Sequence, residues 1–530
     1  MPIQKIAAAC ALLCSAGFAS SALAGVIAGT GGTPSSSVMG ATDATTYAIA
    51  ESGPGHSLVV PYFTAQNGQM TVLHLVNTDL NNGKAVKLRF RGANNGDGLL
   101  HMTVLLAPGD VWTGAVTAGA NGIAQLTTAD ATCTSPRLAP GVAQAFVTER
   151  LNPLWTANVQ ANHTREGAIE AIVAADIPAA AVYGTGQQER SALFTAIRPV
   201  NGTAPCTDAA LNGALLEDTS AEATAASRGL ATPTGGVAGT WYIIDVPNST
   251  TFSGAATAIR AVNNAGRNAR GNYVLFPPTA QTVTAPERYT ADPLLVSAGF
   301  ATRVKNIDGE TSEPTNAAVI QARYYDLPDL STPYYLPAGE RNARRTAGDL
   351  SAQLAATEVM NQYATDPSIS ARTDWVLSMP TKRYSVAYDY SQPPAVARVY
   401  SVVPPSDLGS QYFSGDDTQV KTSPESVCSQ WNLTYFDRQT STKLALSPVV
   451  ACGTVATLGF QEAGRSGVSA SITAQPRSDA FVSGWASIAT NASDGRPIIG
   501  AALLKLTNPN ATPGVAGNYG LTMPHMYKAP

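Results

Sequence analysis

Residues 57–128 contain short runs in which apolar and polar positions alternate. In the clearest run, Val86, Leu88 and Phe90 are each followed by a basic residue, so that 87–91 carries three positive charges. A period of two predicts a strand with one buried face. We therefore expect the basic face of 87–91 to be in contact with water, where its charges would also discourage edge-to-edge pairing.

Turn sequences separate these runs. Asn-Gly pairs and stretches rich in Asp, Asn and Gly tolerate the positive φ angles that close hairpins. Such sequences lie at 67–68, 79–83, 94–98 and 108–110. Short strands with a turn about every ten residues are typical of antiparallel sandwiches. The block therefore predicts an Ig-like or related β-sandwich.

The rest of the chain suggests a second β-rich domain. Residues 25–54 are rich in Gly, Ser, Thr and Ala without a hydrophobic period, which predicts a flexible leader. An N-terminal sandwich with a Gly- and Ala-rich excursion would occupy 55–280. The boundary is placed near 280 because a Pro-rich segment there would connect the two domains. A C-terminal β-rich domain would occupy 281–530. The fold class is thus mainly β, with two Ig-like or related sandwiches.

One helix near 350–363 is predicted to pack on the second domain. Apolar residues recur there with helical spacing, and Pro367 lies beyond the end. The residues of this stripe are Ala352, Ala355, Ala356, Val359, Met360 and Tyr363. The segment 164–177 fits both a helix and a strand, because its apolar residues satisfy both periods.

The first 24 residues have the features of a secretory signal peptide. Lys5 precedes an apolar core, and Ala22-Leu23-Ala24 is a typical cleavage site. Charged residues make up only 13% of the chain and the net charge is -4, without a basic run, which argues against nucleic acid as a partner. No later apolar segment approaches the length of a membrane-spanning helix.

Four cysteines follow the predicted signal peptide, and an even number in an exported protein indicates disulfides. Three pairings are open. Proximity in the sequence favours Cys133 with Cys206 and Cys428 with Cys452, one bond in each half. A metal or redox site is disfavoured because no C-x-x-C motif occurs after the signal peptide and no histidine lies nearby in the sequence.

No motif in the sequence selects a catalytic, metal or cofactor site. The five histidines form no H-E-x-x-H pattern, and His74 and His101 are flanked by apolar residues, which favours half-buried, hydrogen-bonded side chains over ligands. Gly464-Arg465-Ser466-Gly467 is one residue short of a nucleophile elbow. We therefore predict no cofactor and no metal.

The segment 373–383 is the best candidate for a ligand surface. Asp374, Trp375, Lys382 and Arg383 combine an aromatic ring with hydrogen-bond donors that could hold an acidic or sugar ligand. The alternative, which we favour, is a buried tryptophan in a core strand that ends at Lys382 and Arg383.

Four stretches of the sequence form a recognisable set. They are Pro61-Tyr62-Phe63 with 76–78 and 87–91, Thr164-Arg165-Glu166-Gly167, 373–383, and 495–500 with Asn518-Tyr519-Gly520 and His525. Together they resemble a family of exported proteobacterial proteins, known as cell-surface or hypothetical proteins, with an N-terminal β-sandwich. The stretches span most of the chain that follows the signal peptide, and the sequence departs from the family at Ala168 and Met379. The resemblance implies export and a β-rich fold, and it brings no catalytic residues.

We predict an exported, non-catalytic protein of the cell surface or matrix that acts in structure, display or binding. One alternative is an extracellular hydrolase or carbohydrate-active enzyme with a non-standard site. The other is a periplasmic ligand carrier or assembly subunit. The predicted location is the periplasm, the outer surface or the medium. The partner would be a surface, matrix or polysaccharide component, with self-association as a further alternative.

Overall fold

The computed structural model describes most of the chain, in segments. These are residues 26–28, 44–179, 191–214, 228–271, 273–275, 304–306, 311–312, 329–332, 343–388, 399–401, 410–413, 418–422, 425–460, 468, 473–474 and 481–530. The predicted domain boundary near 280 and the predicted signal peptide lie outside the described residues. The prediction of a mainly β protein with antiparallel sheets is confirmed.

The N-terminal half contains two antiparallel sheets. The first has the order β2-β14-β3-β11-β5-β6-β9 and the second the order β10-β8-β7-β4-β12-β13. The strands of the first are β2 (Thr46–Ala50), β14 (Thr257–Val262), β3 (Ser57–Thr64), β11 (Glu166–Pro178), β5 (Asn82–Gly92), β6 (Gly98–Leu106) and β9 (Cys133–Ser135). Those of the second are β10 (Ala143–Ala145), β8 (Ala124–Thr128), β7 (Val111–Ala118), β4 (Gln69–Asn77), β12 (Val237–Asp245) and β13 (Thr250–Ala255).

These two sheets enclose one apolar core. Leu88 and Phe90 of β5 meet Leu75 of β4, Trp112 of β7 and Trp241 of β12 in the same cluster. The alternation that predicted β5 therefore places its apolar residues correctly. The sheets are larger than the sequence suggested, and the Ig-like topology stays a prediction.

The C-terminal half is built from two further sheets. One runs β17-β16-β23-β24-β29-β19-β33, with β25 and β26 also paired to β24, and the other runs β28-β27-β20-β31-β32. The first comprises β17 (Thr311–Ser312), β16 (Val304–Asn306), β23 (Thr418–Thr422), β24 (Glu425–Phe436), β29 (Ser483–Ala489), β19 (Glu358–Ala364), β33 (Met526–Lys528), β25 (Thr442–Leu444) and β26 (Val449–Cys452). The second comprises β28 (Thr473–Ala474), β27 (Val455–Gly459), β20 (Arg372–Ser378), β31 (Ile499–Thr512) and β32 (Val515–Pro524).

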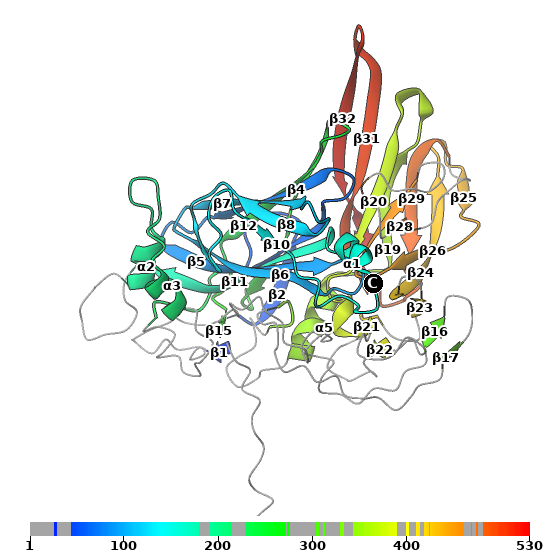
Figure 1. Ribbon diagram of the computed structural model, residues 1–530. Coiled ribbons are helices and arrows are strands. Elements are labelled where there is room, and N and C mark those ends of the chain that lie inside the picture. Colours follow the sequence, from blue (N-terminus) through cyan, green and yellow to red (C-terminus); the bar gives the residue numbers. More distant parts are fainter. Residues whose placement is uncertain are drawn as a thin grey trace, which may run out of the picture.

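The sheet that contains β20 is covered on both faces. Trp375 and Leu377 point into the C-terminal core with Trp431 of β24. Val376, between them, belongs to the N-terminal core, as does Leu503 of β31. The two halves therefore share apolar packing, and Figure 1 shows the N-terminal sheets beside the C-terminal ones.

Short helices and strand pairs complete the described structure. Two helices have serine or threonine N-caps: the hydroxyl of Thr156 accepts from Val159 N, and that of Ser191 accepts from Phe194 N. The helices are α1 (Ala157–His163), α2 (Ala192–Ile197), α3 (Asp208–Ala214) and α5 (Ala343–Gln353), with the 3-10 turns η2 (Pro367–Ile369) and η3 (Lys382–Tyr384). The strand pairs are β1 (Val26–Ala28) with β15 (Tyr273–Leu275), β18 (Ala355–Ala356) with β30 (Arg496–Pro497), and β21 (Val386–Tyr388) with β22 (Val399–Ser401).

The predicted helix near 350–363 is wrong from residue 354 onward, which is ten of its fourteen residues. Helix α5 ends at Gln353, and β19 follows as a strand. Val359 and Tyr363 lie four residues apart, a spacing that puts them on one side of a helix and also of a strand. The pairing of β19 with β29 and β33 makes the segment a strand. As a result Asn361, which lies between Val359 and Tyr363 on the same face, is buried as well.

Two other expectations also change. The prediction of a flexible leader over 25–54 is wrong for Thr46–Ala50, because these residues form β2 and pair with β14. The ambiguous segment 164–177 is mostly β11, which lies between β3 and β5. Strand β11 is paired on both edges and covered on both faces. Such strands have nearly continuous apolar sequences, which explains why 164–177 fitted both the helical and the strand period.

None of the helices in the described part of the chain is long and apolar enough to cross a membrane.

Candidate functional site

The basic side chains of β5 are buried, contrary to the expected wet face. Lys87, Arg89 and Arg91 are at most 4% exposed. The expectation failed because β5 is a central strand, and the side of its sheet away from the apolar core is covered by other chain segments, including Asp329. A sequence period shows which residues share a face, but it does not show what covers that face.

Ion pairs compensate the buried charges of Arg89 and Arg91. The Glu170 carboxylate of β11 lies 3.2 Å from Arg91 Nε and 3.9 Å from Arg89 Nε. Arg89 Nη1 lies 3.6 Å from Asp329 Oδ2. A guanidinium group in the interior is tolerated only when it is paired in this way. The cluster therefore holds the sheet and its covering segment together.

A second buried network surrounds Lys84, at the start of β5. Its ammonium group donates to Asp176 Oδ1 at 2.7 Å, to Asp79 Oδ2 at 2.8 Å and to Thr234 Oγ1 at 2.8 Å. Burial raises the pKa of Asp176. Burial acts in the same direction on Asp79, but hydrogen bonds from Lys84 and Asn82 outweigh it and lower the pKa of that carboxyl. Three acceptors match the three ammonium protons, so this lysine is structurally satisfied.

Ionisable groups also meet where the two halves pack. The Tyr62 hydroxyl of β3 lies 3.1 Å from Glu166 Oε2 and 3.0 Å from the Val468 carbonyl oxygen. Burial, together with the charges of Glu166 and Asp374, raises the pKa of Tyr62 well above its usual value. A phenol of this kind stays protonated at neutral pH, which suits a hydrogen-bond donor rather than a base.

The candidate ligand residues of 373–383 are all buried. Trp375 points into the C-terminal core, and its Nε1 donates to the Gln362 carbonyl at 3.1 Å. Lys382 Nζ donates to the carbonyls of Val427 and Gly453, both at 2.9 Å. The geometry agrees with the favoured alternative in its buried tryptophan, but the core strand β20 ends at Ser378, and Lys382 and Arg383 follow in the turn η3.

Asp374 and Arg383 belong instead to the contact between the halves. The charge of Asp374 acts on Tyr62 of β3. Arg383 packs on the turn after β5, where a Cβ at Gly96 would lie 2.9 Å from its Cδ. Gly96 has a φ of +70°, so both the backbone and the space favour glycine there. The four candidate residues therefore do not converge on one site.

Three histidines are buried as neutral side chains. His56 Nε2 lies 2.8 Å from the Ala269 carbonyl, and His525 Nε2 lies 2.9 Å from that of Val376. His163 stacks on Trp155 with ring centroids 4.2 Å apart. Burial lowers the pKa of each of these histidines from 6.5 to about 4.

The other two histidines lie on different sheets. His74 of β4 is half-buried, with Nδ1 2.7 Å from the Thr113 hydroxyl, as expected. His101 of β6 is fully buried, next to Arg89 in the ladder. Within the described segments, no three His, Cys, Asp or Glu side chains come together in a way that could hold a metal ion.

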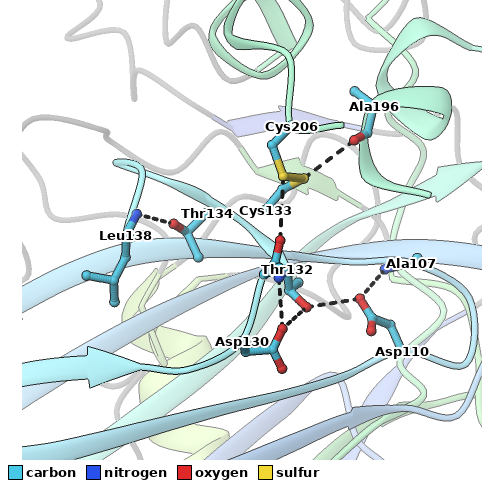
Figure 2. The surroundings of a disulfide bond; sticks show 10 residues. Ala107, Asp110, Asp130, Thr132, Cys133, Thr134, Leu138, Ala196 and Cys206 are labelled. Atoms are coloured by element: carbon cyan, nitrogen blue, oxygen red, sulfur yellow. Dashed lines mark hydrogen bonds between the residues drawn. A yellow bond between two sulfur atoms is a disulfide. The ribbon is translucent and has the colours of Figure 1, made fainter. Parts of the chain in front are cut away.

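Both favoured disulfide pairings are confirmed. Cys133 of β9 is bonded to Cys206, and the Cys133 sulfur lies 3.5 Å from the Ala196 carbonyl oxygen (Figure 2). Cys428 and Cys452 are bonded between directly opposed positions of β24 and β26. Loop closures of 73 and 24 residues correspond to about 3.5 to 4.5 kcal/mol each in the chain-entropy picture.

Among the strands that the structure describes, the β31–β32 hairpin projects furthest from the packed halves (Figure 1). β31 pairs with β20 from Ile499 to Lys505, and the residues of β31 beyond Lys505 pair with β32 alone in the described structure. Val515, Tyr519 and Leu521 of β32 are 58%, 53% and 47% exposed. These residues were not among the predicted site residues.

A signal for this hairpin does exist in the sequence. No Asp, Glu, Lys or Arg occurs from Leu506 to Tyr527, and Pro513-Gly514 marks its turn. Gly514 has a φ of +80°, as a tight turn requires. The lack of charge alone does not distinguish an exposed strand from a buried one.

Comparison with known proteins found no matching family model, no matching curated protein and no matching solved structure.

Proposed function

We propose that the protein is an exported, non-catalytic protein of the cell surface or matrix that acts by binding or display. The observation that carries this proposal is the contrast between the buried ionisable clusters of the protein and its exposed, uncharged hairpin. The ionisable clusters around Lys84, Arg89 and Tyr62 are buried and paired within the protein. The hairpin that extends furthest presents uncharged, partly apolar side chains instead.

This contrast favours binding over catalysis. A catalytic acid or base must reach the substrate and must exchange its proton near the working pH. Glu170 and Asp176 are held in buried ion pairs, and burial raises the pKa of Tyr62 well above neutrality. Exposed apolar side chains, in contrast, are typical of surfaces that bind another molecule.

Two disulfides support export, because such bonds persist in oxidising compartments. The signal-like sequence of residues 1–24 and the resemblance to exported cell-surface proteins point in the same direction.

Cell fractionation combined with thiol alkylation tests the proposal. We expect the protein in the periplasm, on the surface or in the medium, with all four cysteines after residue 24 protected from alkylation. A matched variant that lacks residues 2–24 should stay in the cytosol with free thiols. A wild-type protein that is cytosolic and reduced, or that turns over ester, glycoside or peptide substrates, contradicts the proposal.

A further inference from the structure

Strand β32 has an open edge. It is the last strand of its sheet, and only β31 pairs with it among the residues that the structure describes. Its ten residues contain no charge, and its only proline is the terminal Pro524. Proteins usually guard such edges with charges, prolines or bulges. The neighbouring free stretch of β31 has two of these guards, Pro509 and an irregular register between Asn508 and Thr512.

The two faces of β32 have different surroundings. Thr522 accepts a hydrogen bond from Ser253 N of β13 at 3.1 Å, and a Cβ at Gly520 would lie 2.1 Å from the Thr251 carbonyl oxygen. Even-numbered positions therefore face the N-terminal half, which braces the hairpin. The odd-numbered positions Val515, Tyr519 and Leu521 lie on the opposite, exposed face. The N-terminal half therefore covers one face of β32, and no second strand among the described residues pairs with its outer edge.

The exposed residues are arranged so that the edge can pair with itself. If two copies of β32 meet antiparallel about an axis at Asn518, Val515 lies opposite Leu521 of the other copy. Gly517 then lies opposite Tyr519 of the other copy, while each Tyr519 hydroxyl already lies over the Gly517 of its own chain. In this register the three exposed apolar side chains gain cross-strand neighbours on their own face of the sheet. Since the edge carries no charge, two identical copies meet without repulsion.

We propose that two copies of this chain associate through antiparallel pairing of their β32 edges, which joins the two β31–β32 hairpins into one continuous sheet. The contact is isologous, with one two-fold axis, and therefore closes as a dimer. This inference names the partner of the surface described under the proposed function and rests on that function. A charged partner is not favoured, because the hairpin offers it no opposite charge between Leu506 and Tyr527.

Sedimentation velocity of the oxidised, full-length secreted protein over a concentration series tests the pairing. We expect a reversible dimer. Tyr519→Lys and Tyr519→Glu place like charges close together across the axis, and each should weaken the dimer by about tenfold or more. An equimolar mixture of the two variants should dimerise again, because opposite charges then meet.

Tyr242→Lys is the matched control. Tyr242 is a tyrosine of similar exposure, 38%, on β12 of the N-terminal half, and its replacement should leave the dimer unchanged. At a protein concentration at which the wild type is monomeric, the thermal unfolding midpoints of all variants should match that of the wild type, which excludes misfolding as the cause.

Several results overturn the inference. They are a wild-type protein that stays monomeric at every concentration, a dimer that both Tyr519 variants retain in full, and a mixture that fails to restore it. A monomeric protein whose Tyr519 variants lose attachment to cells would assign the hairpin to a different partner. None of these results affects the proposed export and lack of catalysis, which fractionation and turnover assays test separately.

Discussion

Strands β5 and β32 contrast in a way that their sequences do not show. β5 carries four basic residues and is almost wholly buried. β32 carries no charge and is mostly exposed or half-exposed. The difference comes from position: β5 lies inside its sheet with partners on both edges, whereas β32 ends its sheet. Residue chemistry limits burial, but the place of a strand in the sheet and the available partners decide it.

The largest expected effect concerns the buried histidines of the interior. Burial holds the pKa of His56, His163 and His525 at about 4, against 6.5 in the unfolded chain. Between these values the unfolded state binds more protons, so stability is complete above about pH 6.5 and falls as the pH drops toward about 4. With three groups the slope reaches about 4 kcal/mol per pH unit.

Urea unfolding at several pH values between about 7 and about 5 measures this slope. His525→Gln should lower the number of protons taken up on unfolding by about one. The slope of the unfolding free energy against pH should then fall by roughly a third, because the other two histidines still titrate. An unfolding free energy that does not change over this range would show that the histidines are accessible to protons in the folded state.

The next largest effect concerns the buried ion pairs of β5. Glu170→Ala leaves Arg89 and Arg91 without the carboxylate that they share, which should cost about 3–5 kcal/mol of unfolding free energy. The matched control is Glu358→Ala, whose partner Lys528 is an exposed residue, and it should cost at most about 1 kcal/mol. Equal costs for the two substitutions would contradict the burial of the β5 charges.

A somewhat smaller effect is expected for the disulfide at the edge of the β5 sheet. Replacing both Cys133 and Cys206 by alanine removes a closed loop of 73 residues, which should cost about 2–5 kcal/mol. Urea unfolding of the oxidised wild type and the double variant measures the difference. An unfolding free energy of the double variant equal to that of the oxidised wild type would show that the Cys133–Cys206 bond does not stabilise the fold.

The smallest effect belongs to the hairpin. Tyr519→Ala should change the unfolding free energy of the monomer by no more than about 0.5 kcal/mol, because the side chain is exposed. Denaturant unfolding at low protein concentration is the measurement. A loss comparable to that of Glu170→Ala would mean that Tyr519 is buried within its own chain.

The sequence predicted what depends on local pattern. The alternation of apolar and polar residues predicted β5 and the residues that it places in the apolar core. Proximity in the sequence predicted both cysteine pairs. The failures share one cause, since they depend on contacts between distant segments. Asp329 helps to bury Arg89, and β29 selects a strand at Val359. The projecting hairpin was missed because an uncharged run has the same composition in a core as on an edge that binds another chain.

Hydrogen–deuterium exchange at two protein concentrations, with β5 and β32 followed in the same experiment, tests the central claim most directly. We expect the amides of β5 to exchange slowly at both concentrations, because its ladders to β6 and β11 lie within one chain. The amides of 515–521 that point away from β31 should exchange rapidly when the protein is dilute and more slowly when it is concentrated, whereas those that bond to β31 serve as an internal reference. Exchange at 515–521 that is independent of concentration, or exchange in β5 as rapid as in the hairpin, would contradict the account.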